Sequence, residues 1–155
     1  MTLRDWLLPV EAPSAVFLVR LATGGVFLSE GLQKFLFPVA LGAGRFARIG
    51  IPHAHFMAPF VGAVETVGGA LVLLGLLTRL AALPLAIVMI FAILSTKLPF
   101  WLAHGFWPTA HEARADFAML LCSLFLMAVG PGSFSLDALL GRRPSGQIAV
   151  RSHLG

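Results

Sequence analysis

The chain has 155 residues, of which 58% are hydrophobic and only 12% are charged, and its mean hydropathy is +0.91. Soluble domains carry roughly 25% charged residues, so this composition excludes an ordinary soluble protein and indicates an integral membrane protein. The net charge of +4 comes from scattered basic residues with no Lys/Arg-rich run, and there is one cysteine, so a nucleic-acid-binding segment, a disulfide framework and a thiolate metal site are excluded as well.

Four apolar segments predict four membrane-spanning helices, each of about 20 residues, in a single domain over residues 1–155. The first segment opens after Pro13 and closes before Pro38, and the fourth ends at the stop signal Gly130-Pro131-Gly132. The turn between the second and third segments is very short, so these two helices must be antiparallel neighbours. The predicted spans are residues 14–37, 58–77, 80–98 and 112–129. We therefore predict an all-α fold, an integral membrane four-helix bundle.

The connections between these segments also have recognisable character. Residues 39–55 predict a short interfacial helix, and residues 99–108, rich in Phe and Trp, predict an interfacial aromatic loop. Residues 142–155 form a polar tail that we expect to be disordered. Arginines on the two sides nearly balance, and when short loops are counted they favour both termini in the cytoplasm.

Glu65 lies in the middle of the second predicted helix, where an acid at the bilayer centre costs at least about 2.5 to 3.5 kcal/mol. Helical spacing places it on one face with Ala58, Gly62 and Gly69. Small residues mark close helix contacts in membranes, so we expect Glu65 to face protein rather than lipid.

Other ionisable residues are predicted to lie near Glu65. On the first helix, charge and glycine share one broad side, which carries Arg20, Gly24, Phe27, Glu30, Gly31 and Lys34. The first helix ends and the second begins at the same membrane surface. The rise of 1.5 Å per residue then gives the depth of each charged residue below that surface. The third helix ends there at Lys97, and the fourth begins there with Glu112, Arg114 and Asp116.

Three interpretations of this cluster compete. The first is structural, with Glu30 and Lys34 as an i,i+4 pair and Glu65 paired with Lys34, Lys97 or Arg20 to orient the helices. The second is a polar pocket for a lipid-soluble ligand such as a quinone, in which an acid exchanges a proton and apolar walls hold the ring. The third is a metal or haem site. It would use the loop histidines His53, His55, His104 and His111, but their spacing is not that of a known metal site.

The chain resembles the DoxX family of small four-helix membrane proteins over about residues 14 to 140. The matching pieces keep their order and spacing, and they are Arg20-Leu21, Gly24-Gly25, Glu30-Gly31-Leu32-Gln33-Lys34-Phe35, Gly50-Ile51-Pro52, Glu65, Gly68-Gly69, Leu74-Gly75-Leu76, Thr78-Arg79-Leu80-Ala81-Ala82, Gly130-Pro131-Gly132 and Ser135-Leu136-Asp137. The resemblance implies a four-helix bundle linked to respiratory or quinone-dependent redox systems, including a subunit of a thiosulfate:quinone oxidoreductase. Distant relatives resemble cargo receptors and membrane chaperones, so the fold does not by itself imply an enzyme.

The charge pattern and the resemblance together predict a redox-associated membrane subunit that binds a quinone or similar apolar ligand. Both a catalytic and a non-catalytic subunit fit this prediction. Glu65 and Glu30 are the expected proton-exchanging or ligand-bonding acids. The expected ligand-binding residues or charge partners are Lys34, Arg20, Arg79, Lys97 and Asp116. Asp116 stands where many relatives carry a glutamate.

The alternative is a non-enzymatic membrane adaptor, chaperone or cargo-binding subunit. The sequence predicts no metal and no certain cofactor, with a quinone as the candidate. The expected surroundings are the lipid bilayer of a bacterial cytoplasmic membrane, with membrane or redox-enzyme subunits or a second copy of the chain as partners and no nucleic acid.

Overall fold

The computed structural model describes residues 13–141, so the predicted polar tail at 142–155 lies outside the described residues. Within this range the chain forms helices and no strand, which confirms the predicted all-α fold. The elements are α2 (Val16–Leu36), α3 (Ala43–Arg48), α4 (Ala54–Leu74), α5 (Thr78–Ala92), the π-helix η1 (Ile93–Lys97), α6 (Leu98–His104), α7 (Phe106–Val129) and α8 (Leu136–Gly141).

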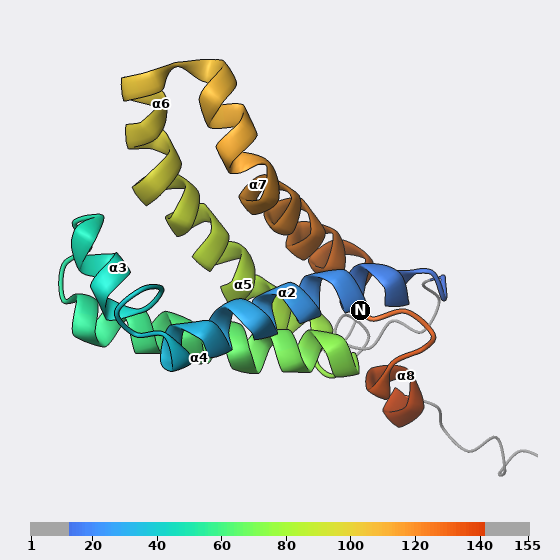
Figure 1. Ribbon diagram of the computed structural model, residues 1–155. Helices are drawn as coiled ribbons and strands as arrows, with labels where there is room; N and C mark the ends of the chain where they lie inside the picture. The colour runs from blue at the N-terminus through green and yellow to red at the C-terminus, as the bar shows by residue number, and fades with distance from the viewer. Residues whose placement is uncertain (1–12, 142–155) are drawn as a thin grey trace, which may run out of the picture.

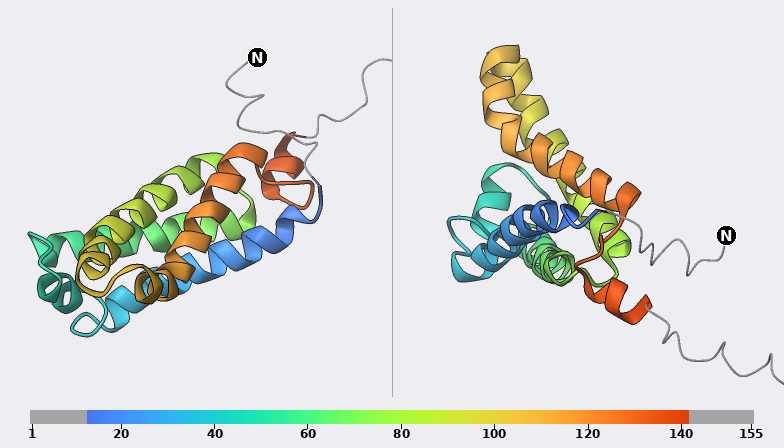
Figure 2. Two further views of the ribbon diagram at one scale, coloured as in Figure 1. Left: turned by 90° about the horizontal axis from the view of Figure 1, so that it is seen from above. Right: turned by 90° about the vertical axis from the view of Figure 1, so that its right-hand side faces the viewer.

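The four long helices form two hairpins that separate toward one end (Figures 1 and 2). In the first hairpin α2 lies along α4, and in the second the continuous helix α5–η1–α6 runs beside α7. The hairpins meet at what we call the closed end, where α2 begins, α4 turns into α5, α7 ends and α8 follows. They diverge toward the open end, which carries α3, α6 and the start of α7. The predicted bundle is therefore an open one.

A small apolar core joins the two hairpins near the closed end. One fully buried side chain from each long helix contributes to it, and these are Phe27, Val72, Leu85 and Leu126. Burying a large aliphatic or aromatic side chain stabilises a fold by about 1.5 to 3 kcal/mol in water. In lipid this gain is smaller, so close packing and polar contacts must carry more of the association.

The predicted aromatic loop at residues 99–108 is wrong, because nearly all of this segment is helical. α6 covers Leu98–His104 and α7 starts at Phe106, with the reversal concentrated at Gly105, whose φ is +81°. Pro108 falls in the first turn of α7, where no backbone N–H is needed, so it is compatible with a helix start. Pro99 directly follows η1 within the continuous helix α5–η1–α6, and φ > 0 is cheap at Gly105 between α6 and α7.

Among the described residues 13–141, two helices are long and apolar enough to cross a membrane, Ala54–Leu74 and Thr78–His104. The other two long helices, α2 and α7, carry three charged residues each, and their crossing stays a prediction. The outer surface of the hairpins exposes many large apolar side chains, among them Leu18, Val67, Ile87 and Leu124. A surface of this kind fits a lipid environment, because soluble monomers rarely expose extended apolar areas.

α2 and α4 approach so closely that their glycines contact backbone. A Cβ on Gly69 would lie 2.5 Å from the backbone nitrogen of Leu28 and 2.9 Å from the carbonyl oxygen of Gly24. A Cβ on Gly31 would lie 2.6 Å from the Thr66 nitrogen and 2.7 Å from the Gly62 oxygen. The glycine faces predicted from helical spacing are therefore the contact surface of this hairpin.

We expect Gly31→Ala to destabilise the protein by about 2 kcal/mol or more, because the added methyl group pushes α2 off the backbone of α4. Gly25→Ala is the matched control, since a Cβ at Gly25 has nothing within 4 Å. Alanine is the better helix former by about 1 kcal/mol, so the control should be neutral or stabilising. Equilibrium unfolding in detergent, followed by circular dichroism, measures both. Equal destabilisation by the two variants would contradict the close contact.

The buried side chains of Arg20 and Asp137 connect several elements at the closed end. Arg20 donates hydrogen bonds to the carbonyls of Val72 (2.9 Å) and Leu73 (2.7 Å) in the last turn of α4, and to those of Pro131 (3.0 Å) and Phe134 after α7. Asp137 accepts from the backbone N–H groups of Leu77 (2.9 Å) and Thr78 (3.2 Å), which begin α5. The α4–α5 turn is thereby tied to α2 and to the segment leading into α8.

Candidate functional site

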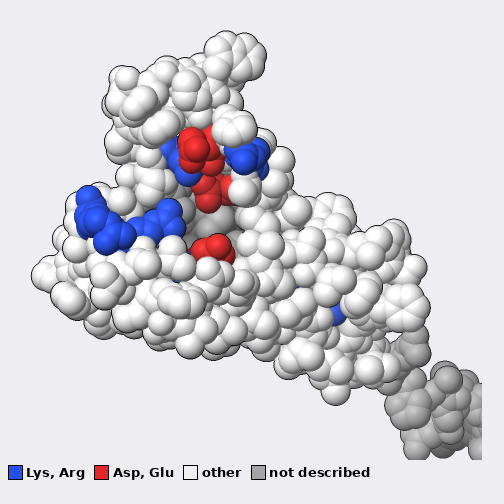
Figure 3. Space-filling model, in the orientation of Figure 1, with Lys and Arg blue, Asp and Glu red and all other residues white. Residues whose placement is uncertain are grey.

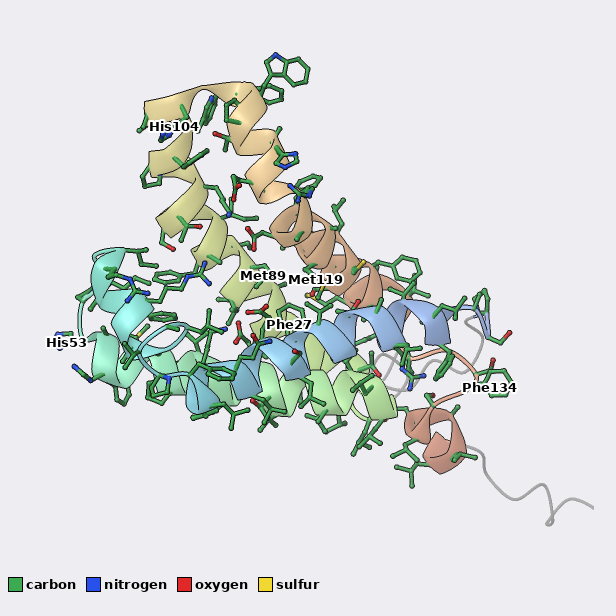
Figure 4. The ribbon with its side chains drawn as sticks, viewed as in Figure 1. Phe27, His53, Met89, His104, Met119 and Phe134 are labelled. Carbon is green, nitrogen blue, oxygen red and sulfur yellow. The ribbon has the colours of Figure 1, made fainter. Side chains whose placement is uncertain are left out.

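A cavity of about 310 Å³ lies between the two hairpins. Phe27, Met89 and Met119, one each from α2, α5 and α7, line it and lie close together where the hairpins meet (Figure 4). The remaining apolar lining comes mainly from the α3–α4 region and α5, and it includes Phe46, Ile51, Val61, Val88 and Ala92. The walls are therefore apolar both where the hairpins meet and beside α3.

The first hairpin contributes a buried ion pair to this cavity. Lys34 Nζ lies 2.5 Å from Glu65 Oε2, and the two side chains are 10% and 4% exposed. Lys34 also donates to the backbone carbonyl of Glu30 at 3.3 Å and lies 3.9 Å from the Glu30 carboxylate, which is half exposed. All three residues line the cavity. Glu65 on α4 therefore faces protein and has a cationic partner, Lys34, on the neighbouring helix α2.

The second hairpin contributes another cation with two acids. Lys97 Nζ, at the end of η1, lies 3.3 Å from Asp116 Oδ2 and 4.0 Å from Glu112 Oε2, both on α7. The Lys97 side chain is 17% exposed and that of Asp116 is 28% exposed. Lys97 therefore links η1 to α7 at the open end, and all three residues line the cavity.

The charged side chains surround a hollow between the hairpins (Figure 3). Arg45 of α3 joins the lining, so the formal charge of the lining side chains is three cations against four carboxylates. The cations are Lys34, Arg45 and Lys97, and the carboxylates are Glu30, Glu65, Glu112 and Asp116. The cavity is thus polar toward its mouth, apolar toward its floor and nearly balanced in charge.

Five of the seven site residues expected from the sequence lie together here, and they are Glu65, Glu30, Lys34, Lys97 and Asp116. The expectation that Arg20 and Arg79 belong with them is corrected, because both lie at the closed end. Arg20 precedes Lys34 by 14 residues, which is about 21 Å along a helix. Arg79 follows the α4–α5 turn and donates to the Ala128 carbonyl at 2.9 Å. Two residues on the same side of a helix can still lie far apart along its axis, and therefore at different depths in the membrane.

Several residues that shape the cavity or its support were not among the predicted site residues. Arg45 and Phe46 arrive through α3, and the interleaved basic and apolar residues of that segment were the available signal. Asp137 is 1% exposed and caps α5, although it lies about 60 residues further along the chain. Local spacing holds no information about that contact.

The loop histidines do not converge. His53 lies at the start of α4 and His104 at the end of α6, far apart in Figure 4. Within residues 13–141, no three His, Cys, Asp or Glu side chains are grouped closely enough to hold a metal ion. The described part of the chain therefore offers no grouped side chains for a metal-ion site.

Chemically, the cavity can hold an apolar molecule that carries polar atoms. Lysine ammonium groups donate hydrogen bonds to carbonyl oxygens, and carboxylates accept them from hydroxyl groups. Ligand sites typically combine apolar walls with a few converging polar groups in about 300 to 1,000 Å³. This cavity lies at the small end of that range.

The chain is similar to a family of membrane proteins. The DoxX family model matches residues 15–105. Among curated proteins, the chain is 54% identical to the uncharacterized membrane protein Rv3486 of Mycobacterium tuberculosis over 143 residues, 88% of each chain. It is 35% identical to a Bacillus subtilis protein named "Putative oxidoreductase CatD" over 120 residues, 77% of this chain and 82% of the relative.

A third relative, an uncharacterized protein of Haemophilus influenzae, is 30% identical over 126 residues, 81% of this chain and 90% of the relative. No solved structure matches the chain. The predicted resemblance is confirmed over more than half of the sequence. The protein is an all-α membrane protein and belongs to the DoxX family.

Proposed function

We propose that this protein is a redox-associated membrane subunit that binds a quinone or a similar apolar ligand in the cavity between its hairpins. The observation that carries the proposal is the buried Lys34–Glu65 pair in the wall of a cavity of about 310 Å³ that also has apolar lining from α2, α5 and α7. The Bacillus subtilis relative whose name refers to an oxidoreductase adds support from similarity.

The residues present fit a quinone ring. Phe27, Met89 and Met119 provide apolar and polarisable surface for the ring. A bound quinone supplies a two-electron, two-proton acceptor, and we assign its electron donor to a partner subunit of the membrane oxidoreductase system.

Within the cavity, Lys34 would donate a hydrogen bond to a ligand oxygen. Glu65 holds the Lys34 ammonium at 2.5 Å and fixes its direction. The Glu30 carboxylate lies 3.9 Å from the same ammonium and is half exposed, so it can exchange protons with water at the mouth of the cavity. Glu65 and Glu30 thus take different parts, Glu65 as the buried orienting or ligand-bonding acid and Glu30 as the acid in contact with solvent.

We expect purified protein in nanodiscs to bind 2,3-dimethyl-1,4-naphthoquinone, with binding seen by titration calorimetry and by a rise in the thermal unfolding midpoint. Ala115→Phe is expected to weaken this binding by about tenfold or more, because Ala115 lines the cavity and a phenyl ring would fill its mouth. Ala118→Phe is the matched control on the same helix, since Ala118 is exposed and outside the lining. If neither assay detects quinone binding to the wild type, the proposal is wrong.

A second candidate function is a non-enzymatic adaptor, chaperone or cargo-binding subunit. It is favoured by the tip between α6 and α7, where Leu102 is 82% and Trp107 is 81% exposed, beside the half-exposed Trp101 and the exposed Phe106. Aromatic residues of this kind either anchor a protein at the membrane interface or contact another protein. Copurification of a membrane protein that Trp107→Ser releases, together with no quinone binding, would favour the adaptor.

We further propose the bacterial cytoplasmic membrane as the location, with both termini on the cytoplasmic side. The three named relatives are bacterial proteins, one of them named as a membrane protein. In this orientation the cavity opens toward the outer face of the membrane. Redox-enzyme subunits or a second copy of the chain are the partners that this proposal expects.

A further inference from the structure

We infer that Lys97, with Asp116, forms a second polar subsite opposite Lys34 and Glu65, so that the cavity selects a flat ring carrying an oxygen atom at each end. This inference rests on the proposed function and deepens it, since it assigns a substrate class to the cavity. Three features support it: the π-helix η1, the two separate ion pairs Lys34–Glu65 and Lys97–Asp116, and the apolar surface that lines the same cavity.

The π-helix turns Lys97 toward the cavity. Val88, Met89 and Ala92 of α5 line the cavity, so they define its inner face. In a regular α-helix the five residues from Ala92 to Lys97 would turn through about 500°, leaving Lys97 about 140° away from Ala92. The bonds of η1 instead reach five residues back, as from Leu98 N–H to the Ile93 carbonyl, and this wider turn brings Lys97 nearer to the side of Ala92.

The sequence contains a local cause for this distortion. The hydroxyl groups of Ser95 (3.3 Å) and Thr96 (2.7 Å) both donate to the Ala92 carbonyl, in competition with the regular backbone bond. Pro99 has no N–H to donate to the carbonyl four residues before it. Ser95, Thr96 and Lys97 all line the cavity. π-bulges occur frequently at functional sites, where they redirect a side chain.

The two ion pairs come from different hairpins and border the same cavity. Lys34 and Glu65 join α2 to α4, whereas Lys97 and Asp116 join η1 to α7. The apolar surface of Phe27, Met89 and Met119 lies where these two pairs of helices meet. A ring bound on that surface would have one lysine on each hairpin, and we assign one ammonium to each of its oxygens. A ring with a single oxygen would leave one of the two lysines without this contact.

The test compares two probes of the same shape, 2,3-dimethyl-1,4-naphthoquinone with two oxygen atoms and 2,3-dimethyl-1-naphthol with one. We expect the wild type to bind the two-oxygen probe more tightly by about tenfold, the ratio that corresponds to about 1.4 kcal/mol and to one charged hydrogen bond. In Lys97→Met this preference should fall to about threefold or less. Titration calorimetry in nanodiscs measures both affinities.

Arg114→Met is the matched control, because it removes the same charge from the same end while Arg114 is exposed and outside the cavity lining. It should keep the preference of the wild type. If Lys97→Met does not fold, the combined variant with Asp116→Asn carries the same prediction, because it removes the closer and less exposed of the two carboxylates paired with Lys97. A wild-type preference retained in the Lys97 variants, or lost equally in Arg114→Met, overturns the second subsite and leaves quinone binding standing. Binding of neither probe to the wild type overturns both proposals.

Discussion

Replacing Glu65 with glutamine is expected to lower the free energy of unfolding by about 3 kcal/mol or more, although the change removes only a charge. The reason is the partner that remains. Lys34 is 10% exposed and lies 2.5 Å from Glu65, so the variant leaves a buried ammonium without its carboxylate. Breaking a buried pair by removing one member typically costs about 3 to 5 kcal/mol. Equilibrium unfolding in detergent at neutral pH, followed by circular dichroism, measures the loss.

Glu30→Gln is the control for this prediction, because the Glu30 carboxylate is half exposed and lies 3.9 Å from the same lysine. It should change stability by about 0.5 kcal/mol or less, as exposed pairs do. A Glu65→Gln variant as stable as Glu30→Gln would show that Lys34 finds water or another acceptor, and that the pair does not hold α2 and α4 together.

A paired substitution separates stability from ligand handling at this site. Lys34→Met combined with Glu65→Leu removes both charges and keeps the side-chain volume similar, and such replacements are often neutral or stabilising. We expect the double variant to regain the stability lost in Glu65→Gln and still bind the naphthoquinone more weakly than the wild type. Quinone affinity equal to that of the wild type would show that the pair serves the fold alone.

Replacing Arg20 with methionine is expected to have the second large effect, a loss of about 4 kcal/mol or more. The Arg20 side chain is 2% exposed and donates to four backbone carbonyls, two at the end of α4 and two between α7 and α8. A hydrogen bond to a charged group contributes about 1.5 to 3 kcal/mol, and a buried carbonyl left without a donor adds its own desolvation cost. The measurement is the same detergent unfolding experiment.

Arg48→Met is the control for Arg20, because Arg48 also donates to two backbone carbonyls, those of Val39 (3.1 Å) and Ala40 (3.0 Å), but is exposed. We expect it to cost about 1 kcal/mol or less, since water can replace these bonds. Arg20→Lys should remain clearly destabilised, because an ammonium lacks the planar fork that reaches several carbonyls. Stability close to the wild type in Arg20→Lys would mean that charge rather than geometry holds the closed end.

The two charged clusters divide the molecule into a fixed end and an open end. At the closed end Arg20 and Asp137 tie α2, the α4–α5 turn and the start of α8 together. At the open end the ion pairs of the two hairpins are separate, and the cavity lies between them. Substitutions at the closed end should therefore change stability most, and substitutions of Lys97 or Ala115 should change ligand binding most.

Much of this architecture could be predicted from the sequence because it depends on local spacing. Apolar runs and their prolines and glycines located the four long helices to within a few residues at most ends. The glycine face of α2 and the small-residue face around Glu65 follow from 3.6 residues per turn, and their backbone contact is confirmed. The depth of Lys34, Glu65 and Lys97 follows from the rise per residue and the direction of each helix.

The tertiary structure alone decided how the helices are placed against one another. Helical spacing gives the direction of a side chain around its own axis, but it contains neither the tilt between two hairpins nor the distance to residues far away in the chain. The pairing of Glu65 with Lys34, the place of Arg20 at the closed end and the capping of α5 by Asp137 depend on those quantities. So does the cavity, because it exists only where the two hairpins diverge.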